Sequence, residues 1–332
     1  MNICICGGGN LGHVCAGFLG ARGHQVSVLT TRPERWSKEI EIVAPDGNFV
    51  GKLAKVTAET KEVVPSADIV LICLPGFAIH DELEQIKPYL SAGCKVGTVV
   101  SSTGFFFEAM KVLSPTTALF GFQRVPFISR TIDYGRMAEL KGYKETLSVA
   151  IANTTEKEAL RAELSALFEK PVILLDSFYE VSLSNSNPLL HPSRTYTMWK
   201  DWQPGIVYPR NPQFYAEWTE EAAALLVQMD NEFQHLMQVL HLKPGCIPTI
   251  LDYYESHDVA SLTQKISTIP AFQNIASPMK EVEGGYVPDF TSRYFTEDFP
   301  YGMRFIVETA HQQEVAIPTI EKVYQWGISK LG

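Results

Sequence analysis

The sequence predicts an α/β fold in which a parallel sheet with covering helices is followed by an all-helical domain. Two observations predict it. Short apolar runs alternate with helical patterns in the first half of the chain, and helical periodicity alone continues after residue 178. Strands that alternate with helices are typical of parallel sheets. At roughly 100–200 residues per domain, the 332 residues are enough for two domains, which we place at residues 1–177 and 178–332.

The first structural unit is a strand, a tight turn, a helix and a second strand. Residues 2–6 are apolar and run directly into GGGNLG. The following VCAGFLGARG repeats apolar and small residues at helical spacing. HQVSVLTT is rich in β-branched residues, so a second strand should end near Thr30. The unit is therefore a βαβ motif.

Later strands continue this rhythm. The apolar run from Ile69 to Leu74 suits a strand buried on both faces. We expect a helix over EKEALRAELSALF. Further strands are expected at KVGTVVSS, TTALFGF, TLSVAIA and PVILL.

Helices account for most of the second half. Apolar residues at i, i+3, i+4 and i+7 predict a long helix over EWTEEAAALLVQMDNEFQHLMQVLHL, which Pro244 and Gly245 should end. Further helices are expected at PTILDYYES, DVASLTQKI and TIEKVYQWGISKL.

Composition excludes several classes of protein. Hydrophobic residues make up 45% of the chain, which argues against a disordered protein, and the net charge of -9 argues against a nucleic-acid partner. The six cysteines lack the spacing of metal sites, so we expect reduced thiols and no bound metal. No targeting segment or apolar run of 18 residues is visible. We expect a cytoplasmic protein that does not bind membranes, and a homodimer is left open.

The glycine-rich turn is typical of a Rossmann dinucleotide site. Gly7, Gly9 and Gly12 form G-x-G-x-x-G between a strand and a helix. Such glycines permit the turn, the approach of a pyrophosphate and close packing of helix on strand. We therefore predict cofactor contacts from the turn, including Asn10 and Leu11, and from Pro75 after a later strand. The alternative is a glycine-rich turn that binds no ligand.

The end of the second strand favours NADP over NAD. NAD sites usually place a carboxylate there for the ribose 2′-hydroxyl. This chain instead has Thr31, Arg32 and Arg35, which suit a 2′-phosphate. NAD stays open, because both arginines could be solvated loop residues.

Two polar segments interrupt the helical half, and their sequences do not fit helix packing. They are Ser184–Pro192, with N-P-L-L-H-P, and Ser292–Gly302, with R-Y-F-T-E-D-F-P-Y-G. Together with G-F-Q-R-V-P-F at residues 121–127, they resemble the octopine/nopaline (opine) dehydrogenase family. The resemblance covers nearly the whole chain.

This resemblance implies an NAD(P)H-dependent enzyme that reduces the imine formed between an amino acid and a 2-oxo acid. By matching positions, His191 would be the general acid/base and Asp298 the carboxylate that orients it. An imidazole that titrates near neutrality and is held by a carboxylate suits this role independently. We expect Asp298 to bond one ring nitrogen and the other to face the nicotinamide. The alternative for His191 is a structural role before Pro192.

Three further residues are predicted to bind substrate. Asn187 lies four residues before His191 and would share a helical face with it, although it could instead cap a helix. Arg293 could hold a carboxylate or the cofactor pyrophosphate in a bidentate fork, or form a surface ion pair. Gln123 matches a family position near the oxo acid.

The remaining aromatic and histidine residues are assigned to packing or to the surface. One aromatic group is interpreted as domain-interface packing rather than a pocket wall: Trp199, Trp202, Tyr208, Tyr215 and Trp218. The other histidines have no comparable surroundings: His13, His24, His80, His235, His241, His257 and His311.

Two other functions compete with the opine dehydrogenase interpretation. A 2-oxo-acid reductase of the ketopantoate reductase type would use a lysine in the helical domain. A non-catalytic NADP sensor would need no acid/base pair. The presence of His191 with Asp298 argues against both.

Overall fold

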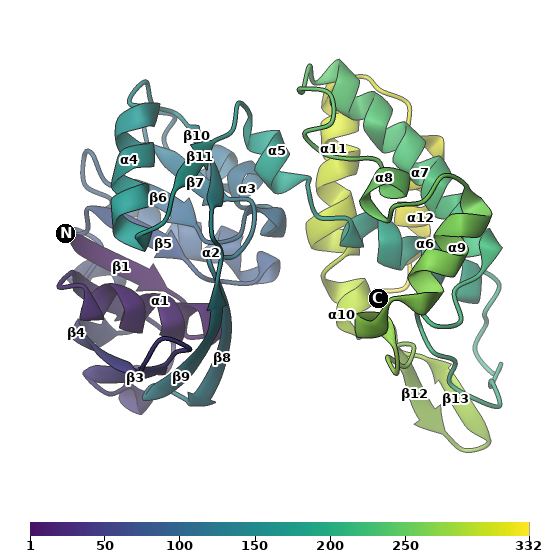
Figure 1. The fold of residues 1–332 in the computed structure, drawn as a ribbon, viewed down its shortest axis with the longest axis horizontal. Helices are drawn as coiled ribbons and strands as arrows, with labels where there is room; N and C mark the ends of the chain where they lie inside the picture. The colour runs from purple at the N-terminus through teal and green to yellow at the C-terminus, as the bar shows by residue number, and fades with distance from the viewer. Residues whose placement is uncertain (332) are drawn as a thin grey trace. The chain divides into compact units, whose positions relative to one another are not determined.

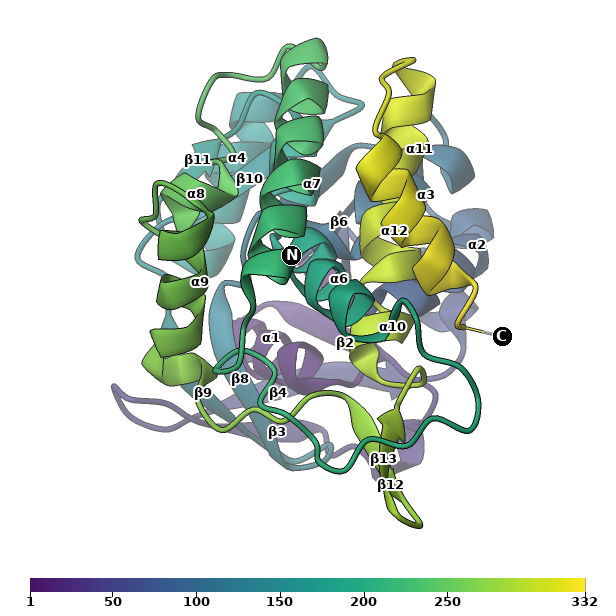
Figure 2. The same ribbon diagram turned by 90° about the vertical axis from the view of Figure 1, so that its right-hand side faces the viewer.

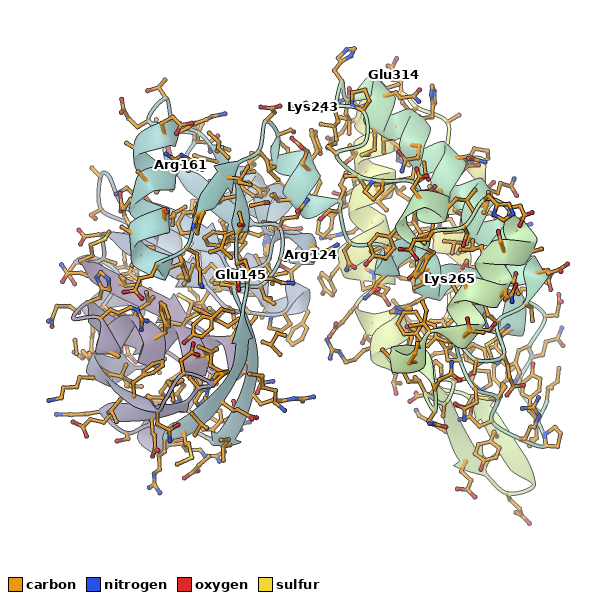
Figure 3. All side chains as sticks on the ribbon, viewed as in Figure 1. Arg124, Glu145, Arg161, Lys243, Lys265 and Glu314 are labelled. Carbon is orange, nitrogen blue, oxygen red and sulfur yellow. The ribbon has the colours of Figure 1, made fainter. Side chains whose placement is uncertain are left out.

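The computed structural model describes residues 1–331, which form two compact units. The first is Met1–Ser184 and the second begins at Asn185 (Figure 1). The expected boundary at residue 177 is too early, because helix α5 (Phe178–Ser182) packs against strands of the first unit. Arg124, labelled in Figure 3, also belongs to the first unit. Its guanidinium donates to the carbonyl of Ser184 at 3.1 Å. Each unit is described separately below.

The first unit is built on an 11-stranded sheet. Its strands are β1 (Asn2–Cys6), β2 (Gln25–Leu29), β3 (Glu39–Val43), β4 (Phe49–Thr57), β5 (Ile69–Ile72), β6 (Lys95–Thr98), β7 (Leu119–Phe122), β8 (Phe127–Asp133), β9 (Met137–Tyr143), β10 (Leu147–Ala152) and β11 (Val172–Leu174). Their order is β11-β10-β7-β6-β5-β1-β2-β4-β3-β9-β8. The longer helices are α1 (Asn10–Ala21), α2 (Gly76–Ile86), α3 (Phe105–Val112) and α4 (Lys157–Phe168).

The expected parallel sheet is confirmed at the centre, and the strands outside it pair partly in parallel and partly antiparallel. Strands β2, β1, β5, β6 and β7 pair in parallel. In contrast, β10 runs antiparallel to β7, and the pairs β3–β4 and β8–β9 are antiparallel. The sequence analysis missed β3, β4, β8 and β9. Polar, exposed residues such as Lys52, Lys55 and Arg130 interrupt these strands, so they lack the continuous apolar runs of the central strands.

Strand β1 joins two hydrophobic cores, one on each face of the sheet. Ile3 and Ile5 pack in the core that contains Phe18 of α1. Cys4 and Cys6 alternate with them and pack in the core that contains Ile79 and Leu83 of α2. Because side chains of a strand point alternately to opposite faces, both cores fix the register of β1. The glycine-rich turn therefore begins at a defined place, the carboxyl end of a central strand.

The second unit is mainly helical. Its helices are α6 (Asn187–Trp199), α7 (Glu220–Val239), α8 (Ile250–Tyr253), α9 (Val259–Thr268), α10 (Arg293–Thr296), α11 (Arg304–Gln312) and α12 (Pro318–Ile328). The four helices expected from the sequence are present as α7, α8, α9 and α12. Helices α6, α7 and α12 pack against one another (Figure 2). A small hairpin, β12 (Met279–Val282) with β13 (Gly285–Pro288), was not expected in an all-helical domain.

Helix α6 corrects one expectation about the polar segments. The residues from Asn187 onward do form a helix, although two prolines argue against one by propensity. Pro188 lies in the first turn, where no backbone donor is needed. Pro192 lies inside the helix and leaves the carbonyl four residues earlier without its helical partner. His191 is thereby held on a buried helix rather than on a loop.

The cysteines and the length of the helices complete the description of the fold. All six cysteines are free, as expected for thiols that form no disulfide. Among the described residues, no helix is both long enough and apolar enough to cross a membrane.

Candidate active site

The glycine-rich turn has the geometry of a phosphate-binding loop. Gly7 has a φ of 114° and donates its N–H to the carbonyl of Leu29 at 3.0 Å. A Cβ on Gly12 would lie 2.0 Å from the carbonyl oxygen of Gly7, so only glycine allows this approach of helix to strand. A Cβ on Gly9 would meet no atom within 4 Å. The space beside Gly9 is open to a ligand.

The amino terminus of α1 completes the cradle. Gly9 is its N-cap, no side chain caps the helix, and the first turn carries no acidic residue. The first backbone N–H groups of such a helix attract an anion, so the turn fits a pyrophosphate. Asn10 lies here, but its side-chain oxygen accepts from the N–H of Thr131 in β8 at 2.9 Å. Leu11 is partly buried against the core, and Pro75 is the exposed N-cap of α2.

The residues predicted to select NADP lie together after β2. Thr31, Arg32 and Arg35 are all exposed at the carboxyl end of this strand. The Arg35 guanidinium lies 4.6 Å from the ring centroid of Tyr134, which limits its freedom. Tyr134 belongs to the turn of the β8–β9 hairpin, which the sequence analysis did not find.

His13 joins the glycine-rich turn to that hairpin. It was assigned to packing or the surface, and the structure shows it fully buried in the first turns of α1. Its Nδ1 donates to the carbonyl of Gly9 at 2.9 Å, and its Nε2 accepts from the N–H of Gly135 at 2.7 Å. Its ring stacks on Trp36 with a centroid distance of 4.2 Å. This pattern of one donor and one acceptor belongs to a neutral imidazole.

We expect the unfolding free energy to fall on acidification, partly through His13. Burial lowers the pKa of His13 in the folded state, opposed by its bond to Gly9. Below about pH 6.5 the His13 imidazole binds a proton in the unfolded chain but not yet in the folded chain, so the unfolding free energy decreases as pH falls. Urea unfolding at pH 7.5 and 5.5 measures this loss. In H13N the difference between the two pH values should shrink, and an undiminished difference would contradict the assignment.

The predicted acid/base pair meets in the helical unit. Nδ1 of His191 on α6 lies 2.7 Å from a carboxylate oxygen of Asp298. The two residues are 107 positions apart in sequence. Asp298 immediately precedes the π-helical turn Phe299–Met303, which packs on α6. The carboxylate therefore accepts from Nδ1–H and fixes the ring orientation.

The second imidazole nitrogen differs from the expectation. Nε2 of His191 lies 2.7 Å from the hydroxyl of Tyr215 instead of being free. The sequence analysis assigned Tyr215 to packing, since nothing in its surrounding sequence separates it from nearby aromatic residues. Only the folded chain shows that it reaches His191. Of the same aromatic group, Trp199 packs on Phe295 inside the helical unit.

A hollow of about 290 Å³ lies beside this pair. Six residues line it: Asn187, His191, Arg293, Tyr294, Glu297 and Asp298. All of them except Tyr294 and Glu297 were predicted from the sequence. Arg293 makes a bidentate pair with Glu297, at 2.8 and 2.7 Å. Its side chain is 84% exposed, so this is the surface ion pair left open above. The fork is occupied by Glu297.

Gln123 belongs to the first unit and has a structural partner there. Its amide nitrogen donates to the carbonyl of Glu180 in α5 at 3.2 Å. This bond ties the segment after β7 to the helix that ends the first unit.

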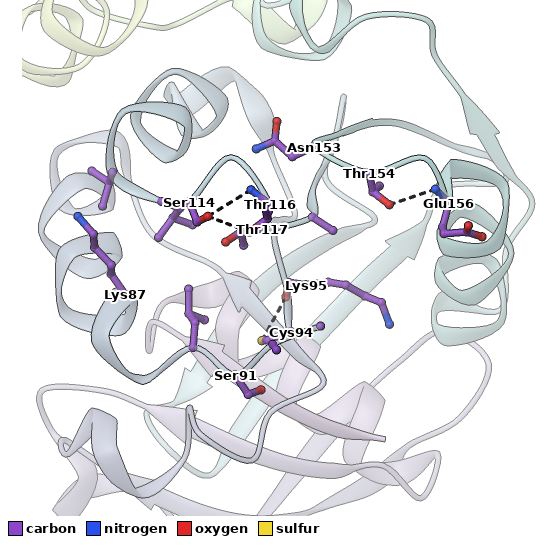
Figure 4. A pocket seen from close by; sticks show the side chains of 16 residues that line it. Lys87, Ser91, Cys94, Lys95, Ser114, Thr116, Thr117, Asn153, Thr154 and Glu156 are labelled. Carbon is purple, nitrogen blue, oxygen red and sulfur yellow. Dashed lines mark hydrogen bonds between the residues drawn. The ribbon is translucent and has the colours of Figure 1, made fainter.

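A hollow of the first unit lies beside the amino-terminal ends of β6 and β7. It measures about 710 Å³ and is lined by residues that include Lys95, Ser114 and Asn153 (Figure 4). Lys95 begins β6, whereas the glycine-rich turn follows the carboxyl end of β1. Ligands of open α/β sheets bind at the carboxyl ends of the strands. Lys95 is also paired with Glu163 at 3.0 Å, and we assign this hollow no role in the reaction.

Comparison with known proteins agrees with this arrangement. Residues 174–330 match the family described as NAD/NADP octopine/nopaline dehydrogenase, alpha-helical domain. The helical domain of this chain belongs to the octopine/nopaline dehydrogenase family. Residues 3–104, all within the first unit, match the family described as ketopantoate reductase PanE/ApbA.

Similarity to proteins of this family extends over both units of the chain. Octopine dehydrogenase of Pecten maximus is 27% identical over 100% of this chain and 90% of its own length. Tauropine dehydrogenase of Arabella iricolor is 29% identical over 99% of this chain and 91% of its own length. A structure of octopine dehydrogenase with NADH and L-arginine has a TM-score of 0.85 at 27% identity, covering 99% of this chain and 89% of that one.

Proposed function

We propose that this protein is an NAD(P)H-dependent opine dehydrogenase, which joins an amino acid to a 2-oxo acid by reducing their imine. The observation that carries the proposal is the contact of 2.7 Å between His191 and Asp298, in a domain that matches the octopine/nopaline dehydrogenases. Two relatives carry the different names octopine dehydrogenase and tauropine dehydrogenase, and the proposal does not specify the amino acid that this protein uses.

The chain's own residues supply binding and proton transfer. The cofactor, when bound, supplies the hydride that the imine carbon receives. The turn from Gly7 to Gly12 and the amino terminus of α1 would hold its pyrophosphate. His191 would take a proton from the attacking amine and return one to the departing hydroxyl. Asp298 keeps Nδ1 protonated and stabilises the imidazolium between these steps.

The substrate contacts are proposals of the same kind. Asn187 lines the hollow and would donate its side-chain amide to a substrate oxygen. Arg293 would release Glu297 and bind a substrate carboxylate instead. Its guanidinium already holds the Glu297 carboxylate through two parallel hydrogen bonds, and a substrate carboxylate could accept the same two bonds. Gln123 would donate its side-chain amide to the oxo acid once its hydrogen bond to the carbonyl of Glu180 has broken.

A panel of amino acids with 2-oxo acids tests the function. Purified protein is mixed with each pair and either NADPH or NADH, and the loss of absorbance at about 340 nm is followed. We expect oxidation only when both an amino acid and an oxo acid are present. Oxidation with the oxo acid alone would instead identify a 2-oxo-acid reductase. Binding of NADPH without any oxidation across the panel would favour the non-catalytic sensor.

We also propose that NADP is preferred over NAD. The exposed Arg32 and Arg35 carry the positive charge that a 2′-phosphate needs. In R32A, NADPH affinity should fall about tenfold or more while NADH affinity stays unchanged, because NADH has no 2′-phosphate. Fluorescence titration of both cofactors measures this. Equal affinity of the unmodified protein for NADPH and NADH would contradict the preference.

We propose that the enzyme works in the cytoplasm. All six cysteines are free, which suits a reducing compartment.

A further inference from the structure

The turn of the β8–β9 hairpin, which contains Tyr134, is fastened to both ends of the candidate cofactor site. The N–H of Gly135 donates to Nε2 of His13 in α1 at 2.7 Å. The carbonyl of Gly135 accepts from the N–H of Ser37, in the loop after β2, at 2.8 Å. A Cβ on Gly135 would collide with the carbonyl oxygen of Arg35, so the turn packs directly against that loop. Tyr134 therefore has a fixed place beside the site.

Neighbouring rings set the orientation of the Tyr134 side chain. Its ring meets the ring of His13 edge-on at a centroid distance of 5.0 Å and the ring of Trp36 edge-on at 6.0 Å. His13 and Trp36 in turn stack on each other. Edge-to-face contacts favour a defined geometry over free rotation. The half-buried side chain of Tyr134 is thus held in one orientation.

The hydroxyl of Tyr134 lies where β1 and β2 end. A Cβ on Gly8 would lie 2.6 Å from this hydroxyl oxygen and 3.0 Å from Oγ1 of Thr30. Gly8 belongs to the glycine-rich turn after β1, and Thr30 directly follows β2. No group among residues 1–331 forms a hydrogen bond with the Tyr134 hydroxyl. Its proton is available to a ligand.

The face of the same ring carries a guanidinium. The central carbon of the Arg35 guanidinium lies 4.6 Å from the ring centroid of Tyr134. The attraction of a cation to an aromatic face restricts the positions of this exposed side chain. Within the described part of the chain, Arg35 has no carboxylate partner. The carboxylate of Asp133, next to Tyr134, lies 4.0 Å from Arg136 instead. The charge of Arg35 is therefore available to an anion.

We propose that Tyr134 is a specificity-determining residue for the cofactor. In a Rossmann fold the pyrophosphate lies at the glycine-rich turn and the adenosine ribose at the end of the second strand. The hydroxyl of Tyr134 lies between these two places and donates to the 2′-phosphate of NADP, and its ring holds Arg35 toward the same phosphate. The inference rests on the proposed NADP preference and adds to it a residue of the β8–β9 hairpin.

Two nucleotides test the inference without the reaction. Adenosine 2′,5′-bisphosphate and adenosine 5′-monophosphate differ only in the 2′-phosphate, and calorimetric titration measures the affinity for each. We expect the unmodified protein to bind the bisphosphate more tightly. In Y134F, which keeps the ring, affinity for the bisphosphate should fall about tenfold or more, because one hydrogen bond to a charged group is lost. Affinity for the monophosphate should stay within about twofold.

A second pair of variants tests the contact between the ring and Arg35. Y134L removes the ring as well as the hydroxyl, so it should lower the affinity for the bisphosphate further than Y134F does. In a Y134L background, R35A should cost less affinity than it costs in the unmodified protein, because the ring acts through Arg35. Single losses that simply multiply in the double variant would show that the ring does not position Arg35.

The matched control is Y143F. Tyr143 ends β9 of the same hairpin, and the Lys170 ammonium lies 5.3 Å from its ring centroid. Removing this hydroxyl should leave the affinity for both nucleotides within about twofold. Melting temperatures without ligand show whether each variant folds. If Y134F is folded and loses affinity for both nucleotides equally, Tyr134 has a structural role and the proposed selection is wrong.

The outcomes keep this inference distinct from the proposals on which it rests. If the unmodified protein prefers the bisphosphate and Y134F keeps the full preference, Tyr134 has no part in selection, while the NADP preference stands. If the unmodified protein binds both nucleotides equally, the NADP preference and the role of Tyr134 fail together. The panel of amino acids and 2-oxo acids decides the opine dehydrogenase activity separately, since neither nucleotide takes part in that reaction.

Discussion

Replacing His191 with asparagine is expected to lower kcat by about 10²–10⁴-fold and to leave the affinity for NADPH nearly unchanged. General acid/base catalysis contributes a factor of this size, and the phosphate-binding turn belongs to the other unit of the chain. Asparagine is smaller and keeps a polar group opposite Asp298, which limits the damage to the buried site. Initial rates with the best substrate pair and a cofactor titration measure both quantities.

The matched control for H191N is H235N. His235 is an exposed residue on α7 of the same helical unit, so its loss should change neither kcat nor cofactor affinity. If H191N oxidises NADPH at the wild-type rate, His191 has only a structural role before Pro192. If H191N loses cofactor affinity as well, the variant has disturbed more than proton transfer.

The second large effect is expected for Gly9→Ala. The added Cβ meets no protein atom within 4 Å, and the backbone at φ -84° and ψ -171° accepts alanine. The free energy of unfolding should therefore change by about 1 kcal/mol or less, the size of a changed N-cap. Affinity for NAD(P)H should fall at least about tenfold, because the methyl group fills the space where the turn approaches the pyrophosphate.

Alanine substitutions at two other glycines are controls for this result. Gly142→Ala adds a Cβ whose nearest neighbour is the Ile128 side chain at 3.9 Å, so stability and cofactor binding should both persist. Gly12→Ala places its Cβ 2.0 Å from the carbonyl oxygen of Gly7, so it should lose stability as well as binding. Undiminished cofactor affinity in G9A would show that the cofactor does not lie against this turn.

The central part of the fold could be predicted because its signals are local. The run from Ile69 to Ile72 is buried on both faces, and the glycine spacing between β1 and α1 is a short motif. Strands β3, β4, β8 and β9 gave no such signal, since their pattern of exposed and buried residues depends on which neighbour they pair with. Strand β3, for example, pairs with β9, which lies about a hundred residues further along the chain.

The candidate site divides in the same way. His191 and Asp298 could be predicted because each lies in a recognisable polar segment. Tyr215 could not, because it stands in an aromatic stretch where packing is the simpler interpretation, and only the position of its loop brings its hydroxyl to Nε2. For Arg293 the sequence left two interpretations open, a bidentate contact with a ligand and a surface ion pair. The structure shows the ion pair, with Glu297.

The β8–β9 hairpin makes the cofactor turn sensitive to a distant part of the chain. Asn10 and His13 accept from Thr131 and Gly135 across 121 and 122 positions of sequence. Hydrogen exchange at these two amides should therefore report whether the turn is formed. A ligand present at 100 times its Kd adds about 2.7 kcal/mol to the stability of the state that binds it. Saturating NAD(P)H should thus slow hydrogen exchange at the amides of Thr131 and Gly135, because both amides donate to residues at the glycine-rich turn.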